Sequence, residues 1–400
     1  MNKKVSLGMT LSLIFLSVAL AVAGTMAASM KIYNGIIKDV AERSGVYSSV
    51  AEIDDIVRNN YFGEINESLL NAMISDGYID GIGDRYSKYM TATEYAQYKD
   101  EEKGNKAGIG IIAVYDNEKN NIYVSEVSKD SPAELQGIQK GDTISSIDSV
   151  KVTPYNNDEL IKNLDGEKLT NVQIEFTHNG EVKTASIPRG YSAQSVYYSA
   201  SDGIGYIKIT AFYSTTADQL KEALKYMASN SVSSVIFDLR NNDLGLIRNA
   251  VSCIDLIVPV ATENSGAVAT AVDKNGNNME VFTSDSESVK YNMVCLINGK
   301  TSGAAELFAC DLRDFGMAQL LGTKTVGNGT MQKIFELSDG SAISLTVAKI
   351  IPYKSDSFNK VGLEPDVEVQ LSPEQNMRLP MLSMEEDTQY IKAVEILTKK

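Results

Sequence analysis

The chain has 400 residues, of which 43% are hydrophobic and 22% are charged, as in ordinary globular proteins. At roughly 150 residues per domain, this length predicts two to three domains. The formal net charge of −15 argues against nucleic acid as a partner, because nucleic-acid binding needs clustered Lys and Arg side chains that displace counterions from phosphate.

The first 30 residues are typical of a membrane-targeting segment. Two lysines precede an uncharged and mostly apolar run over residues 5–30. A helix of this length spans about 30 Å of hydrocarbon, with the lysines inside and the remainder of the chain outside. The stretch Ala21-Val22-Ala23 resembles a cleavage site, so a removed signal peptide is the alternative to a membrane anchor. Both interpretations place residues 31–400 outside the cytoplasm.

The cysteines and the single histidine narrow the possible chemistry. Cys253, Cys295 and Cys310 are odd in number, lie among apolar residues and form no CxxC or Cys/His cluster. We therefore expect buried free thiols, no metal site and no cofactor. His178 precedes an Asn-Gly pair, a strong signal for a tight hairpin turn at the surface. A Ser-His-Asp triad therefore has no suitable base.

Residues 31–104 are predicted to form a helical region. Apolar residues recur at helical spacing in VAEIDDIVRNNY and ESLLNAMISDGYIDGI. Thr91 and Glu94 have the spacing of a capping box, which predicts a helix that starts after Thr91. The charged run at residues 100–103 indicates a solvated boundary before the next region.

Residues 105–190 are predicted to form a compact β-rich module with short alternating strands and two short helices. Within it, Gly108-Ile109-Gly110-Ile111, then SPA at 131–133 and GD at 141–142, resemble the PDZ domain. The resemblance implies that a peptide C-terminus adds a strand and that its carboxylate is held by backbone N–H groups of the glycine-containing loop. A module that only packs on its neighbour is the alternative.

The resemblance also implies which side chains contact the peptide. Ile109, together with Leu160 or Leu164 on the second predicted helix, would supply apolar contacts. Packing in the core of the module explains these three residues equally well.

Strand and helix patterns alternate over residues 191–372, and a last helix is predicted within 373–400. Apolar strands such as SSVIF and YNMVCLI are typical of a largely parallel sheet that is covered on both faces. In residues 295–334 an apolar strand, a small-residue turn and a helix from about Ala304 follow one another. This geometry points backbone N–H groups and one side chain at a bound carbonyl.

Several ordered motifs extend the resemblance over almost the whole chain: GIGDRYSKYMTATEY, the PDZ module, GYIKITAF, DLRNN, the AAE helix, TVGNGTMQ and GLEPDVEV. In this order they resemble the C-terminal processing peptidases, the S41 serine peptidases that carry a PDZ domain. The resemblance implies a multidomain α/β protein with a crotonase- or ClpP-like core, in agreement with the pattern. It also implies serine-type endopeptidase activity with a serine nucleophile, a lysine base and an assisting glutamine, the base being a lysine whose pKa is lowered by burial.

This sequence departs from the family at the implied catalytic positions. Gly303 occupies the serine position and Asn328 the lysine position, whereas the glutamine is kept as Gln332. The spacing of 328 − 303 = 25 residues is that of the family, and the spacing of Asn328 and Gln332 predicts one face of a strand. In DLRNNDLG the family has a glycine pair that helps to build the oxyanion hole, where this chain has Leu244 and Gly245. We predict that Leu244 replaces a residue free to adopt a positive φ.

Ser302 and Lys324 are the nearest substitutes for the lost groups. A shift of one residue at a helix start rotates a side chain by about 100°, and loss of nucleophile and base together costs on the order of a million-fold in rate. We interpret Asp238 and Arg240 as a structural ion pair that closes a strand end.

The sequence therefore predicts a non-proteolytic homologue, anchored in the membrane on its outer side, that binds peptide or protein C-termini as a scaffold or regulatory subunit. It would form homo-oligomers or pair with an active homologue. One alternative is an active peptidase for exported proteins that uses Ser302, and another is a structural assembly protein whose helical ends mediate oligomerisation.

Overall fold

The computed structural model describes residue 17 and residues 24–26, 29–30, 45, 47–103, 107–166, 169–191, 194–261, 267–285 and 288–399. The chain divides into two compact units, Met1–Met73 and Ile74–Lys400. Within the described residues, no helix is both long and apolar enough to cross a membrane. The apolar run over residues 5–30 lies almost wholly outside the described residues, so the anchor and the signal peptide stay predictions.

Helices occur in the region that was predicted to be helical. Residues 47–60 form one helix, and α2 (Glu67–Asp80) follows it. Arg58 links the two through an ion pair with Glu67 at 2.6 Å, and it also pairs with Asp54 of its own helix at 2.8 Å. Helix α3 (Ala92–Glu102) begins at the predicted capping box, in which Thr91 and Glu94 exchange side-chain to backbone hydrogen bonds.

The β-rich module, residues 107–191, has a sheet with the order β3-β4-β5-β7-β8, and β6 pairs with β5. In β7 every second residue from Val172 to Phe176 is buried, so the alternating pattern places one face of the strand in the core. A separate two-stranded sheet joins the two ends of the module. The elements are β2 (Ala107–Gly108), β3 (Ile111–Asp116), β4 (Asn121–Val127), α4 (Pro132–Leu135), β5 (Thr143–Ile147), β6 (Val150–Lys151), α5 (Asn157–Leu164), β7 (Asn171–His178), β8 (Glu181–Pro188) and β9 (Gly190–Tyr191).

The largest sheet of the α/β core has the order β10-β11-β12-β15-β16-β19. All neighbours from β11 to β19 are parallel, and β10 is antiparallel to β11, which confirms the predicted largely parallel sheet. The strands are β10 (Val196–Ser201), β11 (Ile204–Ile209), β12 (Ser234–Asp238), β15 (Asn292–Ile297), β16 (Ala318–Gly322) and β19 (Val367–Glu368).

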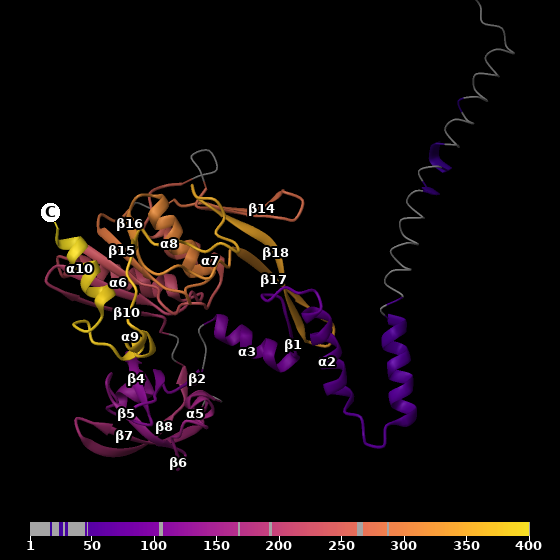
Figure 1. The fold of residues 1–400 in the computed structure, drawn as a ribbon, viewed down its shortest axis with the longest axis horizontal. Coiled ribbons are helices and arrows are strands. Elements are labelled where there is room, and N and C mark those ends of the chain that lie inside the picture. Colours follow the sequence, from indigo (N-terminus) through magenta and orange to yellow (C-terminus); the bar gives the residue numbers. More distant parts are fainter. Residues whose placement is uncertain are drawn as a thin grey trace, which may run out of the picture. The chain divides into compact units, whose positions relative to one another are not determined.

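Helices cover both faces of this sheet (Figure 1). Phe237 of β12 and Cys295 of β15 face the cluster that contains α6 (Thr216–Ser229), α7 (Ile247–Asp255) and α8 (Ala304–Asp314). Their neighbours Ile236 and Val294 face α10 (Thr388–Thr398). The alternation explains why these strands read as continuous apolar runs, because each side of the strand packs against a helix.

A second, antiparallel sheet packs beside the first one and includes the strand that follows the glycine-rich turn. Its order is β1-β18-β13-β14, and β17 pairs with the other edge of β18. The C-terminal segment between this sheet and α10 contains two short helices. The elements are β1 (Lys88–Met90), β13 (Ala269–Val272), β14 (Asn278–Phe282), β17 (Thr330–Glu336), β18 (Ala342–Pro352), α9 (Pro373–Met377) and the 3₁₀ helix η1 (Leu379–Met381).

Candidate functional site

The turn at Gly303, residues 298–303, connects β15 to α8 and is held against the end of β12. Thr301 Oγ1 donates to the carbonyl of Leu239 at 2.9 Å, and Ser302 N donates to the carbonyl of Asn242 at 2.9 Å. Gly303 then has φ 62° and ψ −112°, a conformation that residues with a side chain rarely adopt. The turn therefore places residue 303 at the start of α8 with its missing side chain in a fixed direction.

That direction leads to Asn328. A Cβ built on Gly303 would lie 3.3 Å from Asn328 Nδ2. Asn328 Oδ1 accepts a hydrogen bond from Thr330 Oγ1 at 2.7 Å, and Gln332 Nε2 donates to the same hydroxyl at 2.8 Å. The fold thus brings the three positions named from the sequence together.

Asn328 and Gln332 were expected on one face of a strand. β17 begins only at Thr330, so Asn328 precedes the strand, and the register shifts at a bulge between Met331 and Gln332. The hydroxyl of Thr330 links the two amides, so the side chains of Asn328, Thr330 and Gln332 lie on the same side of the chain.

A buried glutamate, which sequence reasoning missed, holds the two sides of this site together. Glu306 lies in the first turn of α8 and accepts hydrogen bonds from the backbone N–H groups of Gly303, Gly327 and Asn328 at 2.9, 2.7 and 2.8 Å. The hydroxyl of Thr325 donates to it as well. Burial raises the pKa of Glu306, while these hydrogen bonds oppose the rise. Its position three residues after Gly303 was the available signal, since this is where a helix-capping glutamate belongs.

Ser302 and Lys324, the predicted substitutes, have different surroundings. Ser302 is 7% exposed, whereas the side chain of Lys324 is half exposed and forms an ion pair with Glu364 at 2.6 Å. A lysine base must be neutral and desolvated, and a carboxylate partner favours the charged amine instead.

The two oxyanion-equivalent residues differ in backbone conformation. Gly245 has a positive φ of 106°, whereas Leu244 is not among the positive-φ positions of the described chain. That Leu244 replaces a residue free to adopt a positive φ stays a prediction. Phe212 N donates to the carbonyl of Leu244 at 3.0 Å, and a Cβ on Gly245 would meet Phe212 O at 2.3 Å. The pair is fixed by close contact with the backbone of Phe212.

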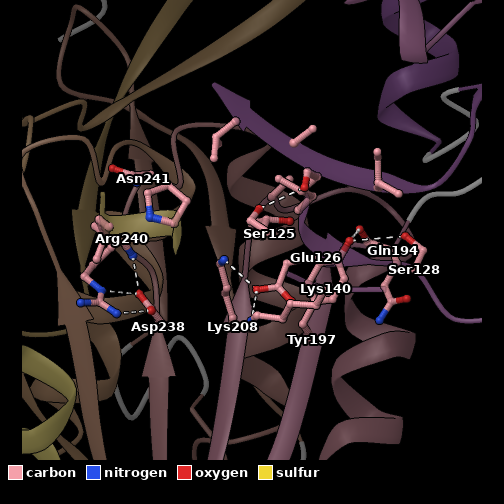
Figure 2. Close-up of a pocket in the computed structure, with 18 of the residues that line it drawn as sticks. Ser125, Glu126, Ser128, Lys140, Gln194, Tyr197, Lys208, Asp238, Arg240 and Asn241 are labelled. Atoms are coloured by element: carbon pink, nitrogen blue, oxygen red, sulfur yellow. Dashed lines mark hydrogen bonds and ion pairs between the residues drawn. The ribbon is translucent and has the colours of Figure 1, made fainter. Parts of the chain in front are cut away.

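A cavity of about 500 Å³ lies between the β-rich module and the core, within the second compact unit (Figure 2). The module contributes β3, the end of α5 and Glu126, and the core contributes Lys208 and the end of β12. The segment 379–384 forms a third wall. Glu126 accepts from Lys208 at 3.0 Å and from Lys140 at 3.1 Å, so one carboxylate joins the module to the core.

Buried charges at the end of β12 form the polar side of this cavity. Arg240 forms ion pairs with Asp238 and Asp387 at 2.6 and 2.7 Å, and Tyr206 donates to Asp238 at 2.7 Å. Burial alone would raise the pKa of Asp238, but the charge and hydrogen bonds of Arg240 hold it below its ordinary value. The structural ion pair predicted for Asp238 and Arg240 is confirmed, and Asp387 extends it to the N-cap of α10.

The groove between β3 and α5, called the peptide groove below, forms the apolar side of the cavity. In the described chain β3 pairs only with β4, so its other edge faces α5. Ile109, Leu160 and Leu164 are 1%, 4% and 4% exposed, and all three belong to the core of the module. Of the predicted peptide contacts, those that also line the cavity are Gly108, Gly110, Ile111 and Leu164.

The remaining sequence signals lie away from the turn at Gly303. His178 ends β7 in the predicted hairpin with β8, whose turn residues Asn179 and Gly180 are exposed. Its Nδ1 lies 2.8 Å from Asp142 Oδ1, and its side chain is 17% exposed. The three cysteines are buried and free, and burial raises the pKa of each thiol. Among the residues that the structure describes, no group of His, Cys, Asp or Glu is placed to hold a metal ion.

Comparisons with known proteins agree with this architecture. Residues 203–369 match the model of "Peptidase family S41" and residues 97–175 match that of "PDZ domain". The chain is 28% identical to the "Probable CtpA-like serine protease" of Staphylococcus haemolyticus over 96% of this chain and 77% of that protein. It is 29% identical to "Carboxyl-terminal-processing peptidase 3, chloroplastic" of Arabidopsis thaliana over 75% of this chain and 59% of that protein.

A solved structure shows the same fold. An S41-type protein from Bacteroides fragilis is similar with a TM-score of 0.55 at 18% identity, over 85% of this chain and 91% of that one. At this identity the similarity concerns the fold alone. Together with the matched models, it confirms the predicted α/β architecture with a PDZ domain. The chain therefore contains an S41 peptidase-family domain and a PDZ domain, and it is homologous to the CtpA-like C-terminal processing proteases.

Proposed function

We propose that this chain is a non-proteolytic S41 homologue that binds peptide segments without cleaving them. The observation that carries the proposal is that a Cβ on Gly303 would lie 3.3 Å from Asn328 Nδ2, so the positions at which the family resemblance implies the serine and the lysine are adjacent. Glycine supplies no nucleophile, and an amide nitrogen is not basic. The link from Asn328 through Thr330 to Gln332 consists of neutral hydrogen bonds, so no group in it takes a proton from an attacking hydroxyl.

The surroundings of the substitute residues support the same conclusion. Lys324 is half exposed and paired with Glu364, whereas a base for Ser302 would need a buried, neutral amine. Leu244, half exposed beside the cavity, occupies the position where the family has the first glycine of its oxyanion pair.

The peptide groove supports a binding role. The edge of β3 that faces α5 offers backbone groups for an added strand, and Ile111, Ile161 and Leu164 line the adjoining cavity with apolar side chains. The PDZ resemblance names peptide or protein C-termini as the ligands, and a chain that holds them without cutting acts as a scaffold or regulatory subunit. An active homologue is one candidate partner.

The N-terminal sequence supports a location outside the cytoplasm. The lysines and the apolar run over residues 5–30 support export, with the second compact unit outside the cytoplasm and the membrane as a contact of the N-terminal segment.

A role in assembly is a second candidate, favoured by apolar side chains near the end of the first unit. Ile53, Ile56 and Phe62 are 61%, 56% and 104% exposed. Exposed apolar groups of this size are typical of protein–protein contacts. Sedimentation of the wild-type chain and of an Ile53→Lys, Ile56→Lys variant tests this role: assembly predicts a loss of oligomer in the variant, and equal masses contradict it.

The main test is a cleavage assay in parallel with a binding assay. Purified chain is incubated with unfolded proteins that have apolar C-termini, fragments are sought by mass spectrometry, and peptide binding is followed by fluorescence anisotropy. We expect binding without cleavage in both the wild type and Ser302→Ala. Cleavage that is lost in Ser302→Ala would contradict the proposal and favour the relocated nucleophile.

The Gly303→Ser, Asn328→Lys variant completes the test, because it returns the implied nucleophile and base to adjacent positions. We expect it to gain cleavage that the wild type lacks. If it stays inactive while folded, Leu244 becomes the next obstacle to remove.

A further inference from the structure

The end of α5 folds onto the glycine-containing loop of the PDZ domain. Ile109 N donates to the carbonyl of Leu164 at 3.3 Å, and Gly166 N donates to the carbonyl of Ala107 at 3.0 Å. Between these contacts, Asp165 and Gly108 form an isolated β-bridge. One of the loop N–H groups that would receive a peptide carboxylate is therefore already used by the last carbonyl of α5.

The side chain of Asp165 lies directly against this loop. A Cβ built on Gly108 would be 2.6 Å from Asp165 Oδ1, a separation that real Cβ atoms essentially never show. Only a glycine at position 108 lets the carboxylate approach this closely. Asp165, Gly108 and Gly110 all line the cavity, so a ligand that reaches the loop meets this carboxylate.

Arg189 fixes the position of the segment that carries Asp165. Its Nε donates to the carbonyl of Asp165 at 3.0 Å, and its Nη2 donates to the carbonyl of Asn163. Its Nη1 donates to Thr170 Oγ1 and to the carbonyl of Asn171 at 3.0 and 3.1 Å. Arg189 is 9% exposed, and these four hydrogen bonds go to oxygens of the main chain or of a hydroxyl. The carboxylate is thus presented by a rigid segment.

We propose that Asp165 makes the peptide groove discriminate against a free C-terminal carboxylate and select extended segments whose chain continues past the loop or ends in an amide. This inference rests on the proposed peptide binding, and it replaces the free C-termini that the PDZ resemblance implies by segments that continue or end in an amide. Two carboxylates in a partly desolvated site repel each other, and a continuing chain or an amide instead offers an N–H donor to Asp165. The ligand is an extended segment with an apolar side chain toward Ile111, Ile161 and Leu164.

The test compares three forms of one fluorescein-labelled decapeptide that ends in Val-Ala-Val: a free acid, a C-terminal amide, and a form extended by Ser-Gly-Ser. Affinities for the full chain are measured by fluorescence anisotropy. We expect the wild type to bind the amide and the extended form about tenfold more tightly than the free acid, as expected for one unfavourable charge contact. Asp165→Asn keeps the size of the side chain, and we expect it to bring the affinity for the free acid within about twofold of that for the amide.

Asp158→Asn is the matched control, because it removes the same charge from the exposed start of the same helix. It should keep the wild-type preference. Tighter binding of the free acid by the wild type, or an unchanged preference in Asp165→Asn, would overturn the inference while leaving peptide binding in place. No binding of any form would overturn the proposed peptide binding and this inference with it.

Discussion

The turn at Gly303 and the peptide groove are two sites in one compact unit, and they differ in which groups hold them together. At the turn, Glu306 receives backbone N–H groups from Gly303, Gly327 and Asn328. These bonds do not depend on the side chains at positions 303 and 328. The groove instead has a surface made by side chains, among them Asp165 and the apolar lining. The turn can therefore keep its fold with different residues at positions 303 and 328, whereas a substitution in the groove changes the surface that a ligand would meet.

The largest expected effect is that of Glu306→Ala, which tests whether the turn really depends on this carboxylate. The change leaves three buried backbone donors without a partner, and we expect the free energy of unfolding to fall by about 3–4 kcal/mol. Urea unfolding followed by circular dichroism measures it. Glu222→Ala removes an exposed glutamate that is paired with Lys225 and serves as the control with no measurable change. Equal stability of the two variants would show that the turn is held by other contacts.

The sequence was sufficient to place Gly303 and Asn328, the two positions that the family resemblance implies as catalytic, next to each other. The strand, turn and helix at residues 295–314 have strong local signals. Between this helix and Asn328 the chain contains β16, which pairs in parallel with β15. The parallel sheet and the PDZ domain could be predicted for the same reason, because their patterns of apolar residues are local.

The features that were missed depend on contacts between distant segments. Asp165 lies on the loop at Gly108 although 165 − 108 = 57 residues separate them. No local pattern distinguishes Ile109, which is buried in the module, from Ile111, which lines the cavity. The sequence spacing also does not predict that residues 379–384 line the cavity. Such pairings depend on tertiary packing, and periodicity reports only which residues are apolar.

The second-largest effect on stability is expected when a side chain is added at position 303. Gly303→Ser places a Cβ at a φ of 62° and 3.3 Å from Asn328 Nδ2, and we expect a loss of about 1–3 kcal/mol in the free energy of unfolding. Gly276→Ser is the matched control, because Gly276 has a φ of 86° with no atom near its Cβ. The control reports the backbone strain alone, so a larger loss at Gly303 measures crowding against Asn328. Equal losses would mean that the turn still has room for a nucleophile.

The pH dependence of stability tests a buried carboxyl group in the core. Asp311 of α8 is buried, and its Oδ2 has no hydrogen-bond partner among the residues that the structure describes. Burial raises the pKa of Asp311 well above its ordinary value. The folded chain therefore binds this proton more strongly than the unfolded chain, so stability falls as the pH rises between the two pKa values, by up to ~1.4 kcal/mol per pH unit.

Asp311→Asn should remove this dependence, because the amide stays neutral at every pH. Unfolding in urea at a series of pH values from about 4 upward measures the slope. Asp339→Asn is the contrasting variant: hydrogen bonds from Ser341 lower the pKa of Asp339, so its contribution is present at higher pH and is lost as the pH falls. An identical slope in Asp311→Asn and the wild type would show that Asp311 is not the responsible group.

The smallest effect is expected at the ion pair that joins the β-rich module to the core. Lys208 of β11 forms an ion pair with Glu126 of β4 at 3.0 Å, and the two side chains are 19% and 11% exposed. Lys208→Met removes the pair but leaves Glu126 with Lys140, so we expect a loss of about 1 kcal/mol or less in the free energy of unfolding. Lys225→Met breaks a pair whose side chains are both about 60% exposed, and it should not change the free energy of unfolding measurably.

Because Lys208 also lines the cavity, hydrogen exchange of the β3 amides should rise in Lys208→Met and not in Lys225→Met. Unchanged exchange in both would mean that the groove keeps its shape without this link to the core.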